Sequence, residues 1–207
     1  MIGIVGAGDQ AREMAAYLGD QLAWFAVNDE YLESARADPR LGAPVLSMRE
    51  AHARDPELAV VIALGYPGDR RRFAEAWPGR LFATHVSDRA WLAEGVPVGE
   101  GSVLCPGAIV NPGGEIGRHV LVNIGATLSH DCSVGDHVTI SPGAHLAGRV
   151  AIGDGTFIGI GATVSDRITV GRGCLIGAGA VVVADVPDAA VVAGVPARVL
   201  RTLDSWP

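Results

Sequence analysis

The chain has 207 residues, 49% of them hydrophobic and 19% charged, a composition that can bury a core and is not that of a disordered protein. Its formal net charge is −7 and all its basic residues are arginines, which argues against nucleic acid as a partner, because nucleic-acid binding needs a basic surface. Three cysteines without a CxxC pair argue against a disulfide framework or a zinc ribbon, and no apolar run is long enough to span a bilayer.

Residues 1–83 carry the alternating strand and helix patterns of an α/β domain. The patterns predict strands at residues 2–5, 23–27 and 58–64, and helices at residues 9–18 and 70–77. Strand–helix–strand order predicts a short Rossmann-like parallel sheet with right-handed crossovers, too small for a complete dinucleotide fold. The first strand begins next to Met1 without a basic, apolar leader, so we expect a cytoplasmic protein.

Residues 84–207 follow a different rule, a repeat of six residues. Every sixth position from 98 to 182 is Val, Leu or Ile, and the position two residues earlier is usually small or β-branched. This is the hexapeptide repeat of a parallel β-helix, in which three hexapeptides form one triangular coil and residues eighteen apart stack. Coils of this fold class wind left-handed. The sequence therefore predicts a left-handed parallel β-helix with a short C-terminal tail.

The phase of the repeat is unbroken from Val98 to Val182 and ends at residues 185–188. No long loop leaves the coil in between, so a site in this domain must lie on the coil surface. A β-helix with an exposed flat face tends to pair with copies of itself, which favours a homo-oligomer.

Four segments of the β-helix carry a resemblance to a known family. They are residues 123–132 (NIGATLSHDC), 141–144 (SPGA), 176–182 (IGAGAVV) and 193–197 (AGVPA). Together with residues 6–8, 28–29 and 63–65 of the first domain, they make nearly the whole chain resemble the sugar O-acyltransferase family. That family includes sialic-acid O-acetyltransferases and nucleotide-amino-sugar N-acetyltransferases. The resemblance implies a homotrimer, acetyl-CoA as co-substrate, and transfer to an amino or hydroxyl group of a sugar or nucleotide-sugar.

The candidate catalytic residues are His130 and Asp131. Acyl transfer from a thioester needs an acceptor that loses a proton as it attacks, and a neutral histidine is the usual base. The eighteen-residue rule stacks Pro112 and Gly148 against His130, and both are compact enough to leave room for a substrate. A neighbouring carboxylate can orient the imidazole. The resemblance implies the same roles, whereas the dipeptide alone would equally fit a surface turn.

The remaining histidines of the β-helix raise the question of a metal. One class of β-helix enzymes binds zinc through a histidine pair five residues apart, but the spacings from His130 to His137 and on to His145 do not match. We therefore expect no metal, and we expect His119, His137 and His145 to be solvated turn residues. A metal-dependent hydratase on the same prism remains an alternative function.

Coenzyme A binds such folds in the groove between adjacent prisms, and the resemblance places several residues there. Those near the expected groove are Thr139, Gly148, Ile160, Gly161, Ala178 and Arg198. A backbone N–H near Gly148 is the expected oxyanion donor. Related enzymes often carry a second histidine where this chain has Thr139, which changes the expected thioester contact. Arg198 could face phosphates or simply begin a solvated helix.

The first domain offers a nucleotide site at its GxGxxA turn. Backbone N–H groups at a helix N-terminus can bind phosphate, and an acid about twenty residues on can bind a ribose or base edge. The residues that the resemblance assigns to a nucleotide-sugar are Gly8, Asp9, Gln10, Asn28, Asp29 and Gly65. Related chains have Gly-His at the position of Asp9-Gln10, so the resemblance does not fix which nucleotide is bound. The alternatives are NAD binding and a purely structural domain.

The sequence thus predicts an acetyl-CoA-dependent acetyltransferase that acts on a sugar. The alternatives are a catalytically inactive scaffold that binds sugar-nucleotides and the metal-dependent hydratase. Release of CoA, bound zinc, and sugar-nucleotide binding without turnover would separate these three functions.

Overall fold

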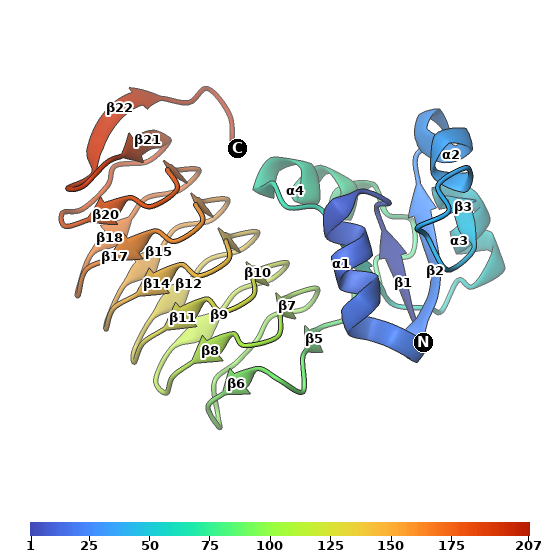
Figure 1. Ribbon diagram of the computed structural model, residues 1–207, viewed down its shortest axis with the longest axis horizontal. Helices are drawn as coiled ribbons and strands as arrows, with labels where there is room; N and C mark the ends of the chain where they lie inside the picture. The colour runs from blue at the N-terminus through green and yellow to red at the C-terminus, as the bar shows by residue number, and fades with distance from the viewer. The chain divides into compact units, whose positions relative to one another are not determined.

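The structure is a computed structural model that describes residues 1–207 and divides into two units (Figure 1). The first comprises residues 1–65 and 69–83, and the second comprises residues 84–207 together with residues 66–68. None of the helices has the length and apolar character needed to cross a membrane.

The first unit is a four-stranded parallel sheet in the order β3-β2-β1-β4. Its strands are β1 (Ile2–Val5), β2 (Leu22–Val27), β3 (Val45–Ser47) and β4 (Val60–Ile62), and its helices are α1 (Asp9–Leu18), η1 (Gly19–Gln21), α2 (Asp29–Arg36), α3 (Met48–Arg54) and α4 (Pro67–Ala76). Ile4, Val5, Val60 and Val61 are fully buried, as expected for strands covered on both faces. The short parallel α/β sheet is confirmed, whereas the sequence patterns missed α2, β3 and α3.

The strand order reverses between β1 and β4, which places a crevice at the carboxyl ends of the strands. The chain leaves β1 at Gly6, β2 at Asn28 and β4 at Leu64, so these three connections meet at one edge of the sheet. The sheet order thereby defines where this unit can hold a ligand.

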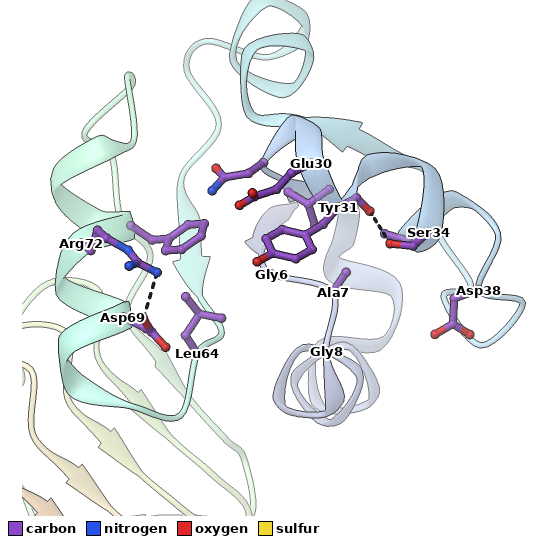
Figure 2. Close-up of a pocket in the computed structure, with 14 residues that line it drawn as sticks. Gly6, Ala7, Gly8, Glu30, Tyr31, Ser34, Asp38, Leu64, Asp69 and Arg72 are labelled. Atoms are coloured by element: carbon purple, nitrogen blue, oxygen red, sulfur yellow. Dashed lines mark hydrogen bonds and ion pairs between the residues drawn. The ribbon is translucent and has the colours of Figure 1, made fainter. Parts of the chain in front are cut away.

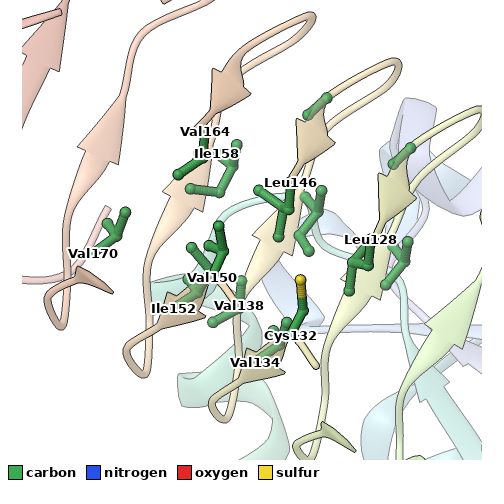
Figure 3. Packing of buried hydrophobic residues seen from close by; sticks show 14 of the residues in the cluster. Leu128, Cys132, Val134, Val138, Leu146, Val150, Ile152, Ile158, Val164 and Val170 are labelled. Atoms are coloured by element: carbon green, nitrogen blue, oxygen red, sulfur yellow. The ribbon is translucent and has the colours of Figure 1, made fainter. Parts of the chain in front are cut away.

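The second unit is a parallel β-helix built from two-residue strands, and the predicted fold is confirmed. The strands of its coils are β5 (His85–Val86), β6 (Trp91–Leu92), β7 (Val103–Leu104), β8 (Ile109–Val110), β9 (Glu115–Ile116), β10 (Leu121–Val122), β11 (Thr127–Leu128), β12 (Ser133–Val134), β13 (Thr139–Ile140), β14 (His145–Leu146), β15 (Ala151–Ile152), β16 (Phe157–Ile158), β17 (Thr163–Val164), β18 (Thr169–Val170), β19 (Leu175–Ile176) and β20 (Val181–Val182). Strands eighteen residues apart pair in register, as Leu121, Thr139 and Phe157 do. The second residue of nearly every strand points inward, and Leu128, Ile158 and Val164 are fully buried (Figure 3).

Three faces of the prism meet at three edges, and each edge is a stack of two-residue corners. The first edge, between the β11 and β12 faces, stacks residues 112–113, 130–131, 148–149 and 166–167, and we call it the His130 edge. The second, between the β12 and β13 faces, stacks residues 118–119, 136–137, 154–155 and 172–173, and we call it the His137 edge. The third stacks residues 124–125, 142–143, 160–161 and 178–179, and we call it the Gly161 edge.

The second residue of each corner adopts a left-handed conformation. Gly161 does so with φ +62°, and Asp131, His137 and Arg149 do so with φ near +60°. Each corner also donates a backbone N–H to the corner one coil below, as Arg149 does to the carbonyl of His130 at 2.9 Å. The corners therefore hold their side chains in vertical ladders at fixed spacing.

The last coil is two residues short. Val186 pairs with Val170 and Val191 pairs with Leu175, sixteen residues apart instead of eighteen, which explains why the phase ends at residues 185–188. The strand β21 (Ala190–Ala193) then turns into the antiparallel strand β22 (Arg198–Thr202). Arg198 therefore begins a strand, and the reading of this residue as a helix start was wrong.

Candidate functional site

His130 and Asp131 form a hydrogen-bonded pair on the His130 edge. The Nδ1 atom of His130 lies 2.9 Å from Oδ2 of Asp131, and about half of each side chain is exposed. A carboxylate can only accept, so the imidazole donates from Nδ1 and its Nε2 carries the lone pair. Proton transfer at this corner would therefore occur at Nε2.

Two neighbours fix the position of Asp131. A Cβ atom at Gly113, one coil below, would overlap the carboxylate, so only glycine leaves the carboxylate this space. Arg149, one coil above, brings its Nε to 3.8 Å from Oδ2. The hydrogen bond from His130, with the charges of His130 and Arg149, lowers the pKa of Asp131. Asp131 thus remains ionised beside the imidazole.

Gly148 has no side chain, so the imidazole of His130 can extend over its backbone. A Cβ atom added there would lie 2.6 Å from Nε2 and 2.7 Å from Cε1 of His130. The φ of Gly148 lies outside the left-handed region, so it is this space rather than the backbone conformation that makes glycine necessary. The Arg149 N–H already binds the His130 carbonyl at 2.9 Å, which removes one of the backbone donors expected near this corner.

His119 and His137 have a different environment, on the His137 edge. Their rings stack with centroids 4.9 Å apart, and the ring of Trp206 tilts against His137 at 6.3 Å. His119 is only 4% exposed, so the expectation that it is a solvated turn residue was wrong, because the stacked rings cover it. No group of three or more His, Cys, Asp or Glu side chains is arranged to hold a metal.

His145 is exposed, but it lies in strand β14 on a flat face of the prism, so the expectation that it is a turn residue was wrong. Its Nδ1 is 2.8 Å from the hydroxyl of Thr127, the residue one coil below in β11. His145 thus belongs to a face of the prism and not to the His130 edge.

The residues expected to hold coenzyme A are not gathered around His130 within one chain. Ile160, Gly161 and Ala178 are exposed on the Gly161 edge, a different edge of the prism. Thr139 is 2% exposed on the β13 face, and Arg198 is exposed in β22. Only Gly148 adjoins the imidazole.

The first unit holds a pocket of about 420 Å³ at the carboxyl edge of its sheet (Figure 2). The residues that line it are Gly6, Ala7, Gly8, Val27, Asn28, Glu30, Tyr31, Ser34, Ala35, Asp38, Leu64, Asp69, Arg72 and Phe73. Gly8 and Asn28 are among the predicted residues, whereas Asp9, Gln10, Asp29 and Gly65 do not line it. Asp9 instead pairs with Arg12 and is directed to solvent.

The charges of this pocket are mostly paired. Arg40 holds both carboxylate oxygens of Asp38 and lowers its pKa to about 2, and Arg72 pairs with Asp69 at 3.0 Å. Figure 2 shows Arg72 and Asp69 on α4 across from Tyr31 on α2. The sequence analysis missed these residues, although the first turns of helices that follow parallel strands commonly line such crevices.

The sequence matches the family described as bacterial transferase hexapeptide (six repeats) at residues 113–148 and 149–184. A search of curated proteins gave no significant match. Solved structures, in contrast, match both units of the chain.

Three solved structures illustrate this likeness. The acetyltransferase domain of PglB from Neisseria gonorrhoeae is 33% identical with a TM-score of 0.81, over 96% of this chain and 98% of that chain. A His-to-Asn variant of perosamine N-acetyltransferase from Caulobacter crescentus, in complex with CoA and GDP-perosamine, is 28% identical with a TM-score of 0.86, over 97% and 96%. WeeI from Acinetobacter baumannii is 28% identical with a TM-score of 0.79, over 97% and 99%. The repeat, the two-unit fold and this likeness together establish that the chain belongs to the hexapeptide-repeat sugar acyltransferases.

Proposed function

We propose that this chain transfers the acetyl group of acetyl-CoA to an amino group of a nucleotide-linked sugar, with His130 as general base. The observation that carries the proposal is the His130–Asp131 pair, in which the imidazole is half exposed and its Nε2 lies over Gly148. The solved structures support both substrates, since one of them contains CoA and GDP-perosamine and another contains acetyl coenzyme A.

The proton moves in the following order. The neutral amine attacks the thioester carbonyl carbon, and a C–N bond forms. The His130 Nε2 takes a proton from the attacking nitrogen, while Asp131 stabilises the imidazolium through Nδ1–H. The C–S bond breaks, CoA leaves as a thiolate, and the thiolate takes the proton from the imidazolium. The products are the amide and CoA.

The carbonyl oxygen becomes negatively charged during this step and needs a donor. Gly148 is the corner residue nearest to Nε2, and its backbone N–H is our candidate. A glycine lets the thioester approach the backbone at that point, since no side chain shields it.

The two sets of predicted residues lie on different edges of one prism, which favours a site shared between copies. In a homotrimer, one chain would supply His130 and Asp131, and its neighbour would supply the Gly161 edge, with Ile160, Gly161 and Ala178, to the pantetheine chain. Arg198 near the end of the helix would then meet the CoA phosphates. Thr139 has the weakest support, because it is buried on the β13 face.

The pocket of the first unit fits the nucleotide part of the acceptor. Its backbone turn at residues 6–8 leads into the N-terminus of α1, where Gly8 supplies no capping side chain, so N–H groups remain for a diphosphate. Tyr31 and Phe73 offer apolar surface for a base. Of the predicted nucleotide residues, we retain Gly8 and Asn28.

The test is CoA release from acetyl-CoA with a panel of nucleotide-linked amino sugars and their hydroxyl analogues. We expect release to be much faster with an amino-sugar acceptor than with its hydroxyl analogue, and to be lost in His130→Ala. Tight sugar-nucleotide binding without CoA release would favour the scaffold instead, and full activity of His130→Ala would refute the assigned base. Because acetyl-CoA is its co-substrate, we expect the reaction in the cytoplasm.

A further inference from the structure

A second polar side chain, that of Asp166, lies close to Gly148 beside the imidazole of His130. The Cβ position at Gly148 lies 2.6 Å from Nε2 of His130, and it also lies 2.9 Å from Oδ1 of Asp166. Asp166 occupies the corner one coil above Gly148 and two coils above His130. Because Gly148 has no side chain, an imidazole nitrogen and a carboxylate oxygen both come close to the same point over its backbone.

Asp166 is held in this orientation by its neighbour. Its other oxygen, Oδ2, pairs with Arg167 at 3.0 Å, and Oδ1 lies over Gly148. The Asp166 side chain is 46% exposed, so a ligand can reach it from solvent. The five titratable or charged groups at these corners are His130, Asp131, Arg149, Asp166 and Arg167, in which each acid lies near an arginine.

We propose that Asp166 and His130 together form the subsite for the acceptor amine and make the enzyme select amines over hydroxyls. This inference rests on the proposed function, and it assigns to Asp166 a contact with the substrate nitrogen. A nitrogen just outside the Gly148 Cβ position can donate one N–H to the His130 Nε2 and its second N–H to the Asp166 Oδ1.

Two hydrogen-bond acceptors, the His130 Nε2 and the Asp166 Oδ1, favour an amine over a hydroxyl because the amine has two hydrogens to donate. A neutral primary amine has two N–H groups and one lone pair, so binding both hydrogens directs the lone pair at the thioester carbon. A hydroxyl has one hydrogen, which His130 would use, and its lone pairs would then face the Asp166 carboxylate. That contact is repulsive, and it leaves the carboxylate without a partner.

The test compares wild type and Asp166→Asn with an amino-sugar acceptor and its hydroxyl analogue. We expect the variant to lose about tenfold to a hundredfold in kcat/KM for the amine, the cost of one hydrogen bond to a charged group, and to keep or raise its kcat/KM for the hydroxyl analogue, because the repulsive contact is removed. The amine-to-hydroxyl ratio therefore falls. A merely structural role would lower both rates together and leave the ratio unchanged.

Two further variants keep the outcome decisive. Glu100→Gln removes a carboxylate that pairs with Arg118 at 2.8 Å on the His137 edge, so it makes the same charge change away from His130 and should leave the ratio at the wild-type value. If Asp166→Asn has a much lower melting temperature than wild type, Asp166→Ser supplies the same comparison. An unchanged ratio in folded variants overturns the role of Asp166 while the proposed function stands. A wild-type protein without any CoA release overturns the proposed function itself.

Discussion

Two edges of the same prism carry histidines in stacked corners, yet they differ in how far the imidazoles are exposed. On the His137 edge, His119 and His137 stack on each other, Trp206 lies over Gly155 and Gly173, and His119 is only 4% exposed. On the His130 edge, the imidazole of His130 extends over Gly148, and about half of its side chain is exposed. The comparison teaches that a repeat can make a reactive site where a histidine of the ladder stays exposed.

The position within the corner also separates the two edges. His119 and His137 are the second, left-handed residues of their corners, with φ of 53° and 59°. His130 is the first residue of its corner, and the left-handed place is taken by Asp131. On the His130 edge, Asp131 thus forms a hydrogen bond with the imidazole, whereas on the His137 edge the acid next to His137, Asp136, accepts the backbone N–H of Arg118.

Removing the imidazole from each edge gives the largest contrast. We expect His130→Ala to lower kcat/KM for CoA release by roughly 10²–10⁴-fold, the usual contribution of a general base. His137→Ala should instead lower the melting temperature and leave kcat within about twofold, because it only opens the ring stack. Assays of CoA release and thermal melting on both variants check this. Equal loss of activity in both would contradict the distinction between the edges.

Adding a side chain at Gly148 gives the next largest effect. Gly148→Ala should reduce kcat/KM by roughly 10²-fold with little change in melting temperature, because the new Cβ displaces the imidazole without straining the backbone. Gly155→Ala on the His137 edge is the control. It has φ +66° and carries Trp206, so it should lose stability and keep its activity once folded. Normal turnover by Gly148→Ala would show that substrate does not approach Nε2 there.

Removing the charge of Asp131 should give a smaller effect. Asn tolerates the left-handed conformation at this corner as Asp does, so Asp131→Asn isolates the charge, and we expect about a tenfold loss in kcat. The pKa of Asp131 is lowered in the folded chain by the His130 hydrogen bond, so its ionised form adds stability above the unfolded pKa near 4. That contribution disappears as the pH falls through the lower, folded pKa.

The melting-temperature difference between wild type and Asp131→Asn should accordingly be present at pH 7 and shrink below about pH 4. Melting curves between pH 3 and pH 7 measure it. A difference that grows on acidification would reverse the assigned sign.

A change on the His137 edge should have the smallest effect on kcat. Trp206→Ala should cost about 1–3 kcal/mol of unfolding free energy and leave kcat unchanged, because the ring covers Gly155 and Gly173 far from the catalytic corner. Denaturant unfolding of the variant, with CoA release as a second readout, tests this. A large loss of kcat would link the C-terminal tail to catalysis.

The repeat made most of the second unit predictable, because a period of six fixes which residues point inward and which stack. The same rule stacks Gly148 against His130. It also stacks His119 against His137, eighteen residues apart, and this stack buries His119, which we expected to be solvated. The rule could not show that Oδ1 of Asp166 lies over Gly148, since this depends on the pairing of Asp166 with Arg167. It could not place Trp206 against His137 either, because no period places the C-terminal tail.

The first unit was less predictable, because short helices such as α2 carry little periodicity. Tyr31 lies on α2, and Arg72 lies on α4, whose predicted bounds gave no hint of a lining face. The glycines of the turn after β1 were recognisable because their role is in the backbone, whereas Asp9 was assigned to the ligand through the family resemblance, and in the structure it pairs with Arg12.

The short last coil has a consequence for how the protein behaves in concentrated solution. A stack of parallel coils ends in unpaired backbone groups, which could recruit the end of another molecule and grow into a fibre. Here the chain reverses, and β22 runs antiparallel to β21 with an irregular register at Val191 and Val192. The exposed surface of β22 carries Arg198 and Arg201. The coil end of another molecule would therefore face a strand that runs in the opposite direction and carries positive charge. We therefore expect β22, which follows the short coil, to oppose end-to-end polymerisation.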